Sequence, residues 1–175
     1  PNLQKRNPID LANLLSTPSA KTRLHAQQEI LRRGGSGKEV LAVAVDKKLD
    51  PKSRVAAIYT LKQLLGTKSH KELLKLVDDP AVAEHALRAL GDRKTQLDGI
   101  PQAPFTKALK SKNPRVQVAA AVALGRLGDK SAASALLSVS NPPEIDPLPS
   151  FAGVPKQDAG PQDVQQTSLI DGNKE

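Results

Sequence analysis

Residues 113–128 read NPRVQVAAAVALGRLG, and this stretch decides the fold because three other windows of the chain repeat its pattern. Each window has a proline that follows Thr, Asp or Asn, then an alanine, and then Ile or Leu four residues after that alanine. The four pairs are Ala26 with Ile30, Ala57 with Leu61, Ala86 with Leu90, and Ala120 with Leu124. Successive pairs lie 31, 29 and 34 residues apart, which indicates stacked helical repeats rather than one globular core.

Each window predicts where a helix begins and ends. Thr, Asp and Asn cap helix N-termini, and proline is tolerated in the first turn because its missing N–H has no partner there. The predicted helix starts are Thr17-Pro18, Asp50-Pro51, Asp79-Pro80 and Asn113-Pro114. Glycine often follows the last helical residue, and the predicted stops are Gly34, Gly66, Gly91 and Gly128.

A second, shorter apolar segment precedes each of these helices. The four segments are residues 9–15, 40–45, 73–77 and 105–109. Two of them follow predicted capping boxes, Ser36 with Glu39 and Ser69 with Glu72. Two antiparallel helices cannot bury their apolar faces alone, so neighbouring pairs must stack. The sequence therefore predicts an all-α fold, an α-α superhelix of about four helical pairs with a partial fifth over residues 130–138.

Prolines and charge divide the chain after residue 138. Five prolines follow Pro142, and each lacks an amide donor and disfavours helical geometry in the residue before it. Residues 1–138 hold 24 Lys and Arg against 12 Asp and Glu, whereas residues 139–175 hold 2 against 6. We expect a basic helical repeat domain over residues 1–138 and an acidic, proline-rich, mostly irregular tail over residues 139–175.

Residues 113–129 resemble the second helix of a HEAT repeat, and the Arg-Val-Ala-Ala sequence at residues 54–57 is similar. The resemblance covers residues 8–138 and implies a HEAT-like solenoid. The third unit departs from the pattern, because Ala81 to Glu84 stand where an arginine is usual. The link before the fourth unit, residues 92–104, is also long.

A closer similarity concerns Ala86 to Arg88 and the Gly-Arg-Leu-Gly-Asp sequence at residues 125–129, followed by Ser131 to Ala133. This sequence pattern is similar to that of the HEAT region of large bacterial membrane-bound dehydrogenases. That resemblance implies an upstream β-propeller, a downstream c-type haem domain, and export to the periplasm or cell envelope. We expect this sequence to be a segment of a longer protein in which it positions those domains.

Several chemistries find no support among the residues. There is no cysteine, which excludes disulfides, thiolate metal sites and haem attachment within this sequence. The glycine cluster at residues 34–38 lacks the spacing of a phosphate-binding loop. His25 and His85 fall about two repeats apart, too far for one metal ion, and we expect His70 to be solvent-exposed. The adjacent acids Asp78 and Asp79 fit a helix start.

We therefore expect no catalytic residue, cofactor or metal ion in this segment, which is predicted not to be an enzyme. No run of about 18 apolar residues is present to span a membrane. Arginines near the start of the second helices are expected to bond to the turn between the helices and to tie repeats together. These arginines are Arg23, Arg54 and Arg115.

The second helices usually line the concave side of such a stack, and they carry a mixed set of polar side chains. The candidate partner-binding residues are Arg32, Tyr59, Gln63, Arg88 and Arg126. A mixed surface suits protein contacts, so the predicted function is a non-catalytic scaffold or protein–protein docking module. The partner's identity and the oligomeric state stay open.

Two alternatives remain. The first is an anion- or nucleic-acid-binding solenoid, because the repeat domain is basic. Its lysines concentrate on the first helices, and one Tyr without any Trp offers little base stacking, so we do not expect nucleic acid as a partner. The second is a HEAT-like lyase-type enzyme, which predicts a deep concave pocket with acidic and aromatic groups around Tyr59.

Overall fold

The computed structural model describes residues 3–128, 133–134 and 136–137, and these residues contain no β-strand. Within them, α-helices follow one another in pairs. The pairs are α1 (Pro8–Asn13) with α2 (Ala20–Arg33), α3 (Lys38–Val45) with α4 (Pro51–Leu65), α5 (His70–Leu74) with α6 (Ala83–Gly91), and α7 (Ala103–Ala108) with α8 (Pro114–Leu127). Short 3-10 turns are η1 (Leu3–Lys5), η2 (Leu14–Ser16), η3 (Gly66–Ser69) and η4 (Lys94–Gln96).

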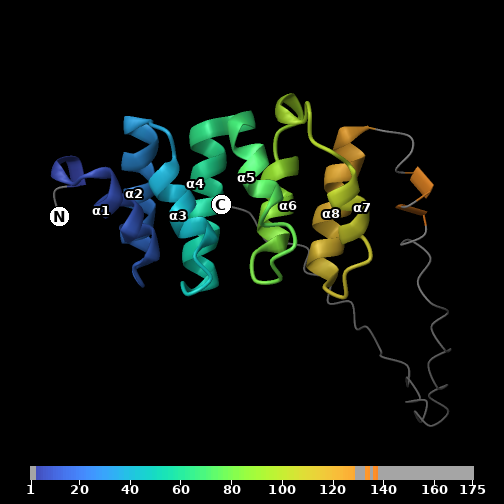
Figure 1. The fold of residues 1–175 in the computed structure, drawn as a ribbon, viewed down its shortest axis with the longest axis horizontal. Coiled ribbons are helices and arrows are strands. Elements are labelled where there is room, and N and C mark those ends of the chain that lie inside the picture. The colour runs from blue at the N-terminus through green and yellow to red at the C-terminus, as the bar shows by residue number, and fades with distance from the viewer. Residues whose placement is uncertain (1–2, 129–132, 135, 138–175) are drawn as a thin grey trace, which may run out of the picture. The chain divides into compact units, whose positions relative to one another are not determined.

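The helical pairs stack in chain order, and the second helices begin at one common edge of the stack (Figure 1). Helix α2 packs against α4, α4 against α6, and α6 against α8, while α1 packs against α3. This is the predicted α-α superhelix, and its four helical pairs are confirmed. Most of the expected fifth unit and the whole tail over residues 139–175 lie outside the described residues.

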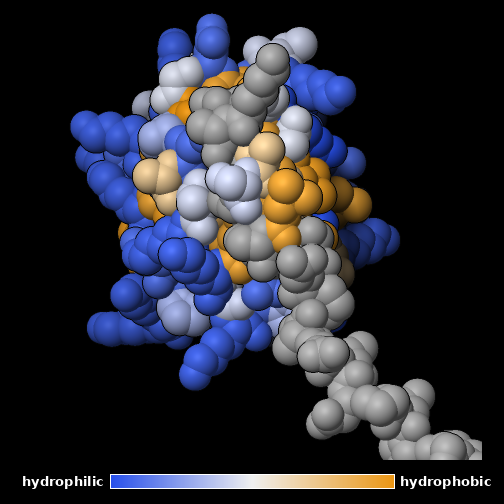
Figure 2. All heavy atoms as spheres, turned by 90° about the vertical axis from the view of Figure 1, so that its right-hand side faces the viewer, coloured by the Kyte–Doolittle hydropathy of each residue, from blue (hydrophilic) through white to orange (hydrophobic). Residues whose placement is uncertain are grey.

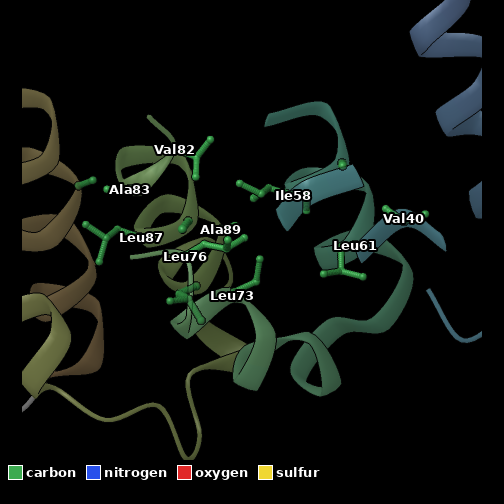
Figure 3. Packing of buried hydrophobic residues seen from close by; sticks show 14 of the residues in the cluster. Val40, Ile58, Leu61, Leu73, Leu76, Val82, Ala83, Leu87 and Ala89 are labelled. Carbon is green, nitrogen blue, oxygen red and sulfur yellow. The ribbon is translucent and has the colours of Figure 1, made fainter. Parts of the chain in front are cut away.

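The core is made of small and aliphatic side chains. The four repeat alanines, Ala26, Ala57, Ala86 and Ala120, are fully buried. Their partners four residues later, Ile30, Leu61, Leu90 and Leu124, are buried as well. Figure 3 shows how the buried residues of α4, α5 and α6 fill the space between these helices. The repeat signature is therefore the contact surface of the second helices.

Arg54 ties two successive repeats together. Its side chain is only 3% exposed, its Nε donates to the carbonyl oxygen of Ala44 at 3.0 Å, and its Nη2 lies 2.6 Å from Asp79 Oδ2. It thus joins the end of α3 to the turn before α6, as expected. Arg23 bonds to the carbonyls of Thr17 and Pro18, so it contacts the turn of its own pair as expected, but these bonds do not tie two repeats together. The expectation is wrong for the third arginine, because Arg115 is exposed and its side chain bonds to no turn group in the described part of the chain.

Two of the four predicted helix starts are confirmed, because Asp50 and Asn113 are the N-cap residues of α4 and α8, but only Asn113 caps through its side chain. Asn113 Oδ1 accepts from the amide of Arg115 at 3.0 Å, at the start of α8. Helix α2 begins three residues after Thr17, because Ser19 caps it instead. Helix α6 begins at Ala83 after a turn, because the Asp79 carboxylate is held by Arg54 and by the amide of Ala81.

Both predicted capping boxes are wrong. The residue that caps α3 is Gly37, in the left-handed conformation with φ of 71°, and a Cβ there would lie 3.0 Å from Leu61 and Leu65. The Ser69 hydroxyl donates backwards to the Gly66 carbonyl at 2.6 Å rather than accepting from a later amide. The prediction that His70 is solvent-exposed is also wrong, because this residue is only 8% exposed.

His70 is buried because it pairs with a buried lysine. Lys62 is 3% exposed, and its Nζ lies 2.8 Å from His70 Nε2. The pKa of His70 is lowered mainly by burial and further by the Lys62 charge. The pKa of Lys62 is also lowered, mainly by burial; the Asp92 charge raises it and the Arg93 charge lowers it. A lysine ammonium can donate only to a neutral imidazole nitrogen, so this contact requires uncharged His70.

This contact predicts loss of stability on mild acidification. The unfolded chain protonates His70 below its ordinary pKa of about 6.5, whereas the folded chain resists protonation, so acid favours unfolding. The stability that depends on His70 is complete above that pH and decreases as the pH falls toward the lowered folded pKa. Thermal unfolding measured from about pH 7 to about pH 5 should show a falling Tm.

The control is His70→Gln, which keeps an acceptor for Lys62 but does not titrate. Its Tm should change less than the wild-type Tm over the same interval. The stability that comes from the lowered pKa of Glu29 is lost mainly below its ordinary value of 4.5, which lies under this interval. Equal pH responses of the two proteins would contradict the account.

Candidate functional site

A pocket of about 220 Å³ opens on the layer of second helices, between α4, α6 and α8. We name it the Tyr59 pocket. Its lining residues are Tyr59, Leu87, Arg88, Gly91, Asp92, Val118, Ala119, Val122, Ala123 and Arg126. It brings together three of the five predicted partner-binding residues, Tyr59, Arg88 and Arg126.

The pocket exists because α6 and α8 approach each other closely. A Cβ at Gly91 would lie only 2.7 Å from Ala123 Cβ, so a residue with a side chain cannot occupy that position without a shift. Arg126 then reaches across to the end of α6, where its Nη1 donates to the carbonyls of Gly91 at 2.6 Å and Asp92 at 3.0 Å. Sequence reasoning identified Gly91 only as a helix stop, and its packing role was missed.

The apolar wall of the pocket comes from α8. Val118 is 55% exposed and Val122 is 47% exposed, although both are large hydrophobic residues. Figure 2 looks onto the α7–α8 end of the described helices and shows hydrophobic side chains at the surface between hydrophilic ones. Sequence reasoning missed both valines. The available signal was that apolar residues surround much of α8, more than one core-facing stripe needs.

The polar wall combines an aromatic hydroxyl with charges of both signs. Tyr59 OH lies 3.1 Å from His85 Nδ1, and the two rings meet edge to face with centroids 5.8 Å apart. Burial raises the pKa of Tyr59, so its hydroxyl stays protonated at neutral pH. Arg88 Nε donates to Glu84 Oε1 at 3.0 Å, whereas exposed Asp92 has no ion pair in the described part of the chain.

The other two candidate residues do not line this pocket. Gln63 is exposed on α4. Arg32 makes two bonds to Glu29, of 2.9 and 2.7 Å, and Arg33 makes a third of 2.7 Å. The bonds from Arg32 and then Arg33 lower the pKa of Glu29 to about 2.

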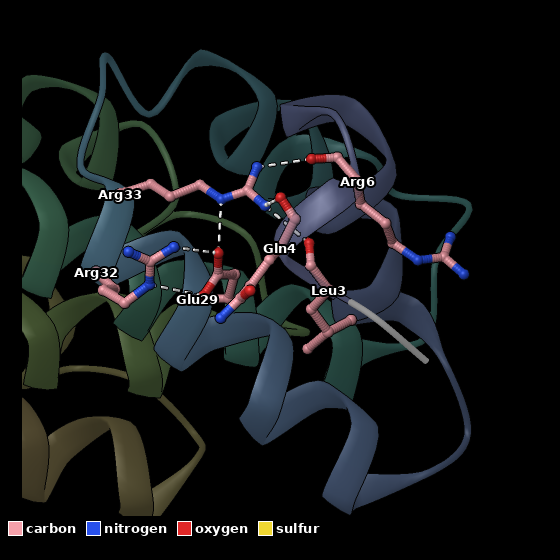
Figure 4. Close-up of polar contacts among 6 residues, drawn as sticks. All are labelled: Leu3, Gln4, Arg6, Glu29, Arg32 and Arg33. Atoms are coloured by element: carbon pink, nitrogen blue, oxygen red, sulfur yellow. Dashed lines mark hydrogen bonds and ion pairs between the residues drawn. The ribbon is translucent and has the colours of Figure 1, made fainter.

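The cluster of Glu29, Arg32 and Arg33 anchors the N-terminal segment through Arg33. Its guanidinium also donates to three backbone carbonyls of the N-terminal segment, those of Leu3, Gln4 and Arg6 (Figure 4). The segment before α1 is thereby held against the end of α2. Glu29 orients both arginines, so Arg32 belongs to a structural cluster rather than to the Tyr59 pocket.

The described residues hold no group of three or more His, Cys, Asp or Glu side chains placed to bind a metal ion. The lyase-type alternative predicted acidic and aromatic groups around Tyr59, and the pocket contains one of each, Asp92 and Tyr59 itself. That alternative stays a prediction. None of the helices in the described part is long and apolar enough to cross a membrane.

A family model for HEAT repeats matches residues 71–146, which include α6 to α8 and all of α5 except its first residue. Together with the stacked helical pairs, this match supports HEAT-like repeats in the α-α superhelix; HEAT repeats commonly act as protein-interaction scaffolds and are generally not catalytic. No curated protein matches the chain.

The close approach of α6 and α8 can be tested at Gly91. Gly91→Ala should destabilise the protein by about 1–3 kcal/mol, because the added methyl group overpacks the contact with Ala123. Denaturant unfolding would measure the loss.

Gly125→Ala on α8 is the matched control, because a Cβ there meets nothing within 4 Å. It should be neutral or stabilise the protein by about 0.5–1 kcal/mol through helix propensity. If Gly91→Ala were as harmless as Gly125→Ala, the packing role of Gly91 would be disproved.

Proposed function

We propose that this chain is a non-catalytic docking module that binds another protein across α4, α6 and α8. The observation that carries the proposal is the pair of exposed valines on α8, which form one wall of a pocket flanked by Arg88 and Arg126. Exposed aliphatic surface beside polar and charged groups is the usual composition of protein interfaces, in which aromatic and arginine side chains are enriched.

The size of the pocket favours a protein side chain over a small molecule. Cofactor and drug-sized ligand sites enclose about 300–1,000 Å³, and the Tyr59 pocket has about 220 Å³. Because three successive second helices contribute to it, a partner would contact several repeats at once. Repeat proteins commonly bind partners along such continuous surfaces.

A finer proposal concerns the parent protein. The similarity of residues 125–129 to the HEAT region of bacterial membrane-bound dehydrogenases supports a role in positioning a propeller domain and a c-type haem domain, in the periplasm or cell envelope. The coding sequence on either side of this segment tests it. Flanking propeller and haem-binding domains are expected, and other flanking domains would contradict this role.

The docking function predicts that peptides selected for binding depend on Val122. A random-peptide library would be panned against the immobilised full chain, and bound peptides would be retested on Val122→Arg. This substitution should weaken binding about tenfold or more, because it removes an interface anchor and places a charge in the pocket. Val122 is about half exposed, so the fold should persist.

Val45→Arg is the matched control, because Val45 is 43% exposed on α3, outside the pocket. Binding should survive that change. Enrichment of no peptide, or equal losses with both variants, would refute docking at the Tyr59 pocket.

A further inference from the structure

We propose that the Tyr59 pocket takes a peptide segment in which an aliphatic side chain lies next to a carboxylate. This inference rests on the proposed docking function and specifies the chemistry of the partner. It has two parts, an apolar seat and a pair of cationic donors beside it.

The seat fits one aliphatic side chain. Its floor comes from Leu87, Ala119 and Ala123, all buried, and its open side is bordered by Val118 and Val122. The alanines and Gly91 keep the floor low, because none of them projects beyond Cβ. An inserted aliphatic group would cover the two valines and remove apolar surface from water on both partners.

The cationic donors are only partly used within the protein. Arg126 Nη1 bonds to two backbone carbonyls, which fixes the guanidinium at the end of α6, but its Nε and Nη2 make no bond in the described part of the chain. Arg88 is bound to Glu84 through Nε alone and its side chain is 50% exposed, so both its Nη groups are available. A guanidinium with free N–H groups pairs best with a carboxylate.

Asp92 opposes the arginines electrostatically. It lines the same pocket, is exposed and forms no ion pair in the described residues, so it repels a second negative charge. A partner carboxylate therefore gains from pairing with the two arginines and loses part of that gain to repulsion by Asp92. A partner that instead presented a lysine to Asp92 would bind more weakly after Asp92 is neutralised and would not need the two arginines. Substitutions of Asp92 and of the arginines therefore distinguish the two kinds of partner.

The peptides selected in the panning experiment test this chemistry through their sequences. Enrichment of Leu, Ile or Val next to Asp or Glu, or at a free C-terminus, is expected, and peptides with each carboxylate source would be synthesised in acid and amide form. The amide forms should bind about tenfold more weakly. Selected peptides that depend on Val122 but carry no carboxylate would overturn this inference and leave the docking function intact.

Substitutions in the pocket give the second test, by fluorescence polarisation with a selected peptide. Arg126→Gln and Arg88→Gln should each weaken peptide binding, and the more damaging of the two should raise the Kd about tenfold. Asp92→Asn should strengthen binding by roughly twofold to fivefold. Arg115→Gln, which removes an exposed arginine of the same helix away from the pocket, should change little. Because Arg126 also bonds to α6, Arg88 and Asp92 carry the test if Arg126→Gln unfolds. Weaker binding to Asp92→Asn would contradict the inference.

Discussion

The structure depends on the close contact of successive second helices through small side chains. A single helical pair exposes too much apolar surface to be stable, so each pair must bury its second helix against the next. Alanine recurs at the contact point of every repeat, and each of these alanines is fully buried. Between α6 and α8 the contact is closer still, since Gly91 lies where any Cβ would meet Ala123. The spacing of the repeats, and hence the positions of the side chains between them, follows from this contact.

The Tyr59 pocket is a consequence of the same contact. Small residues bring the helix axes together, and the larger side chains on either side, Tyr59, Val118 and Val122, then border a hollow instead of filling it. Helix α8 carries more apolar residues than its buried stripe uses, and the excess faces the pocket. Stability and binding thus share one surface, with Arg126 fixed across it by the carbonyls at the end of α6.

The features that recur in every repeat could be predicted from the sequence, whereas those that depend on individual side-chain contacts were missed. Regular spacing was enough for the helical pairs, and the position of Arg54 near the start of a second helix was enough for its role. Capping failed at Ser36 and Ser69, because backbone conformation and a competing carbonyl decide which group a serine hydroxyl meets. Three of the five candidate residues meet in one pocket, but Arg32 is held by Glu29, a pairing that requires knowing which side of α2 faces the N-terminal segment.

The central claim is that the surface left open by the α6–α8 contact is where a partner binds. Methyl NMR of the full chain during titration with a selected peptide tests it most directly. The account predicts that the methyl signals of Val118, Val122 and Ala123 shift together and saturate, while those of Ile9 and Val45 on the first helices stay in place. Saturating shifts at Ile9 or Val45, with Val118 and Val122 unmoved, would contradict it.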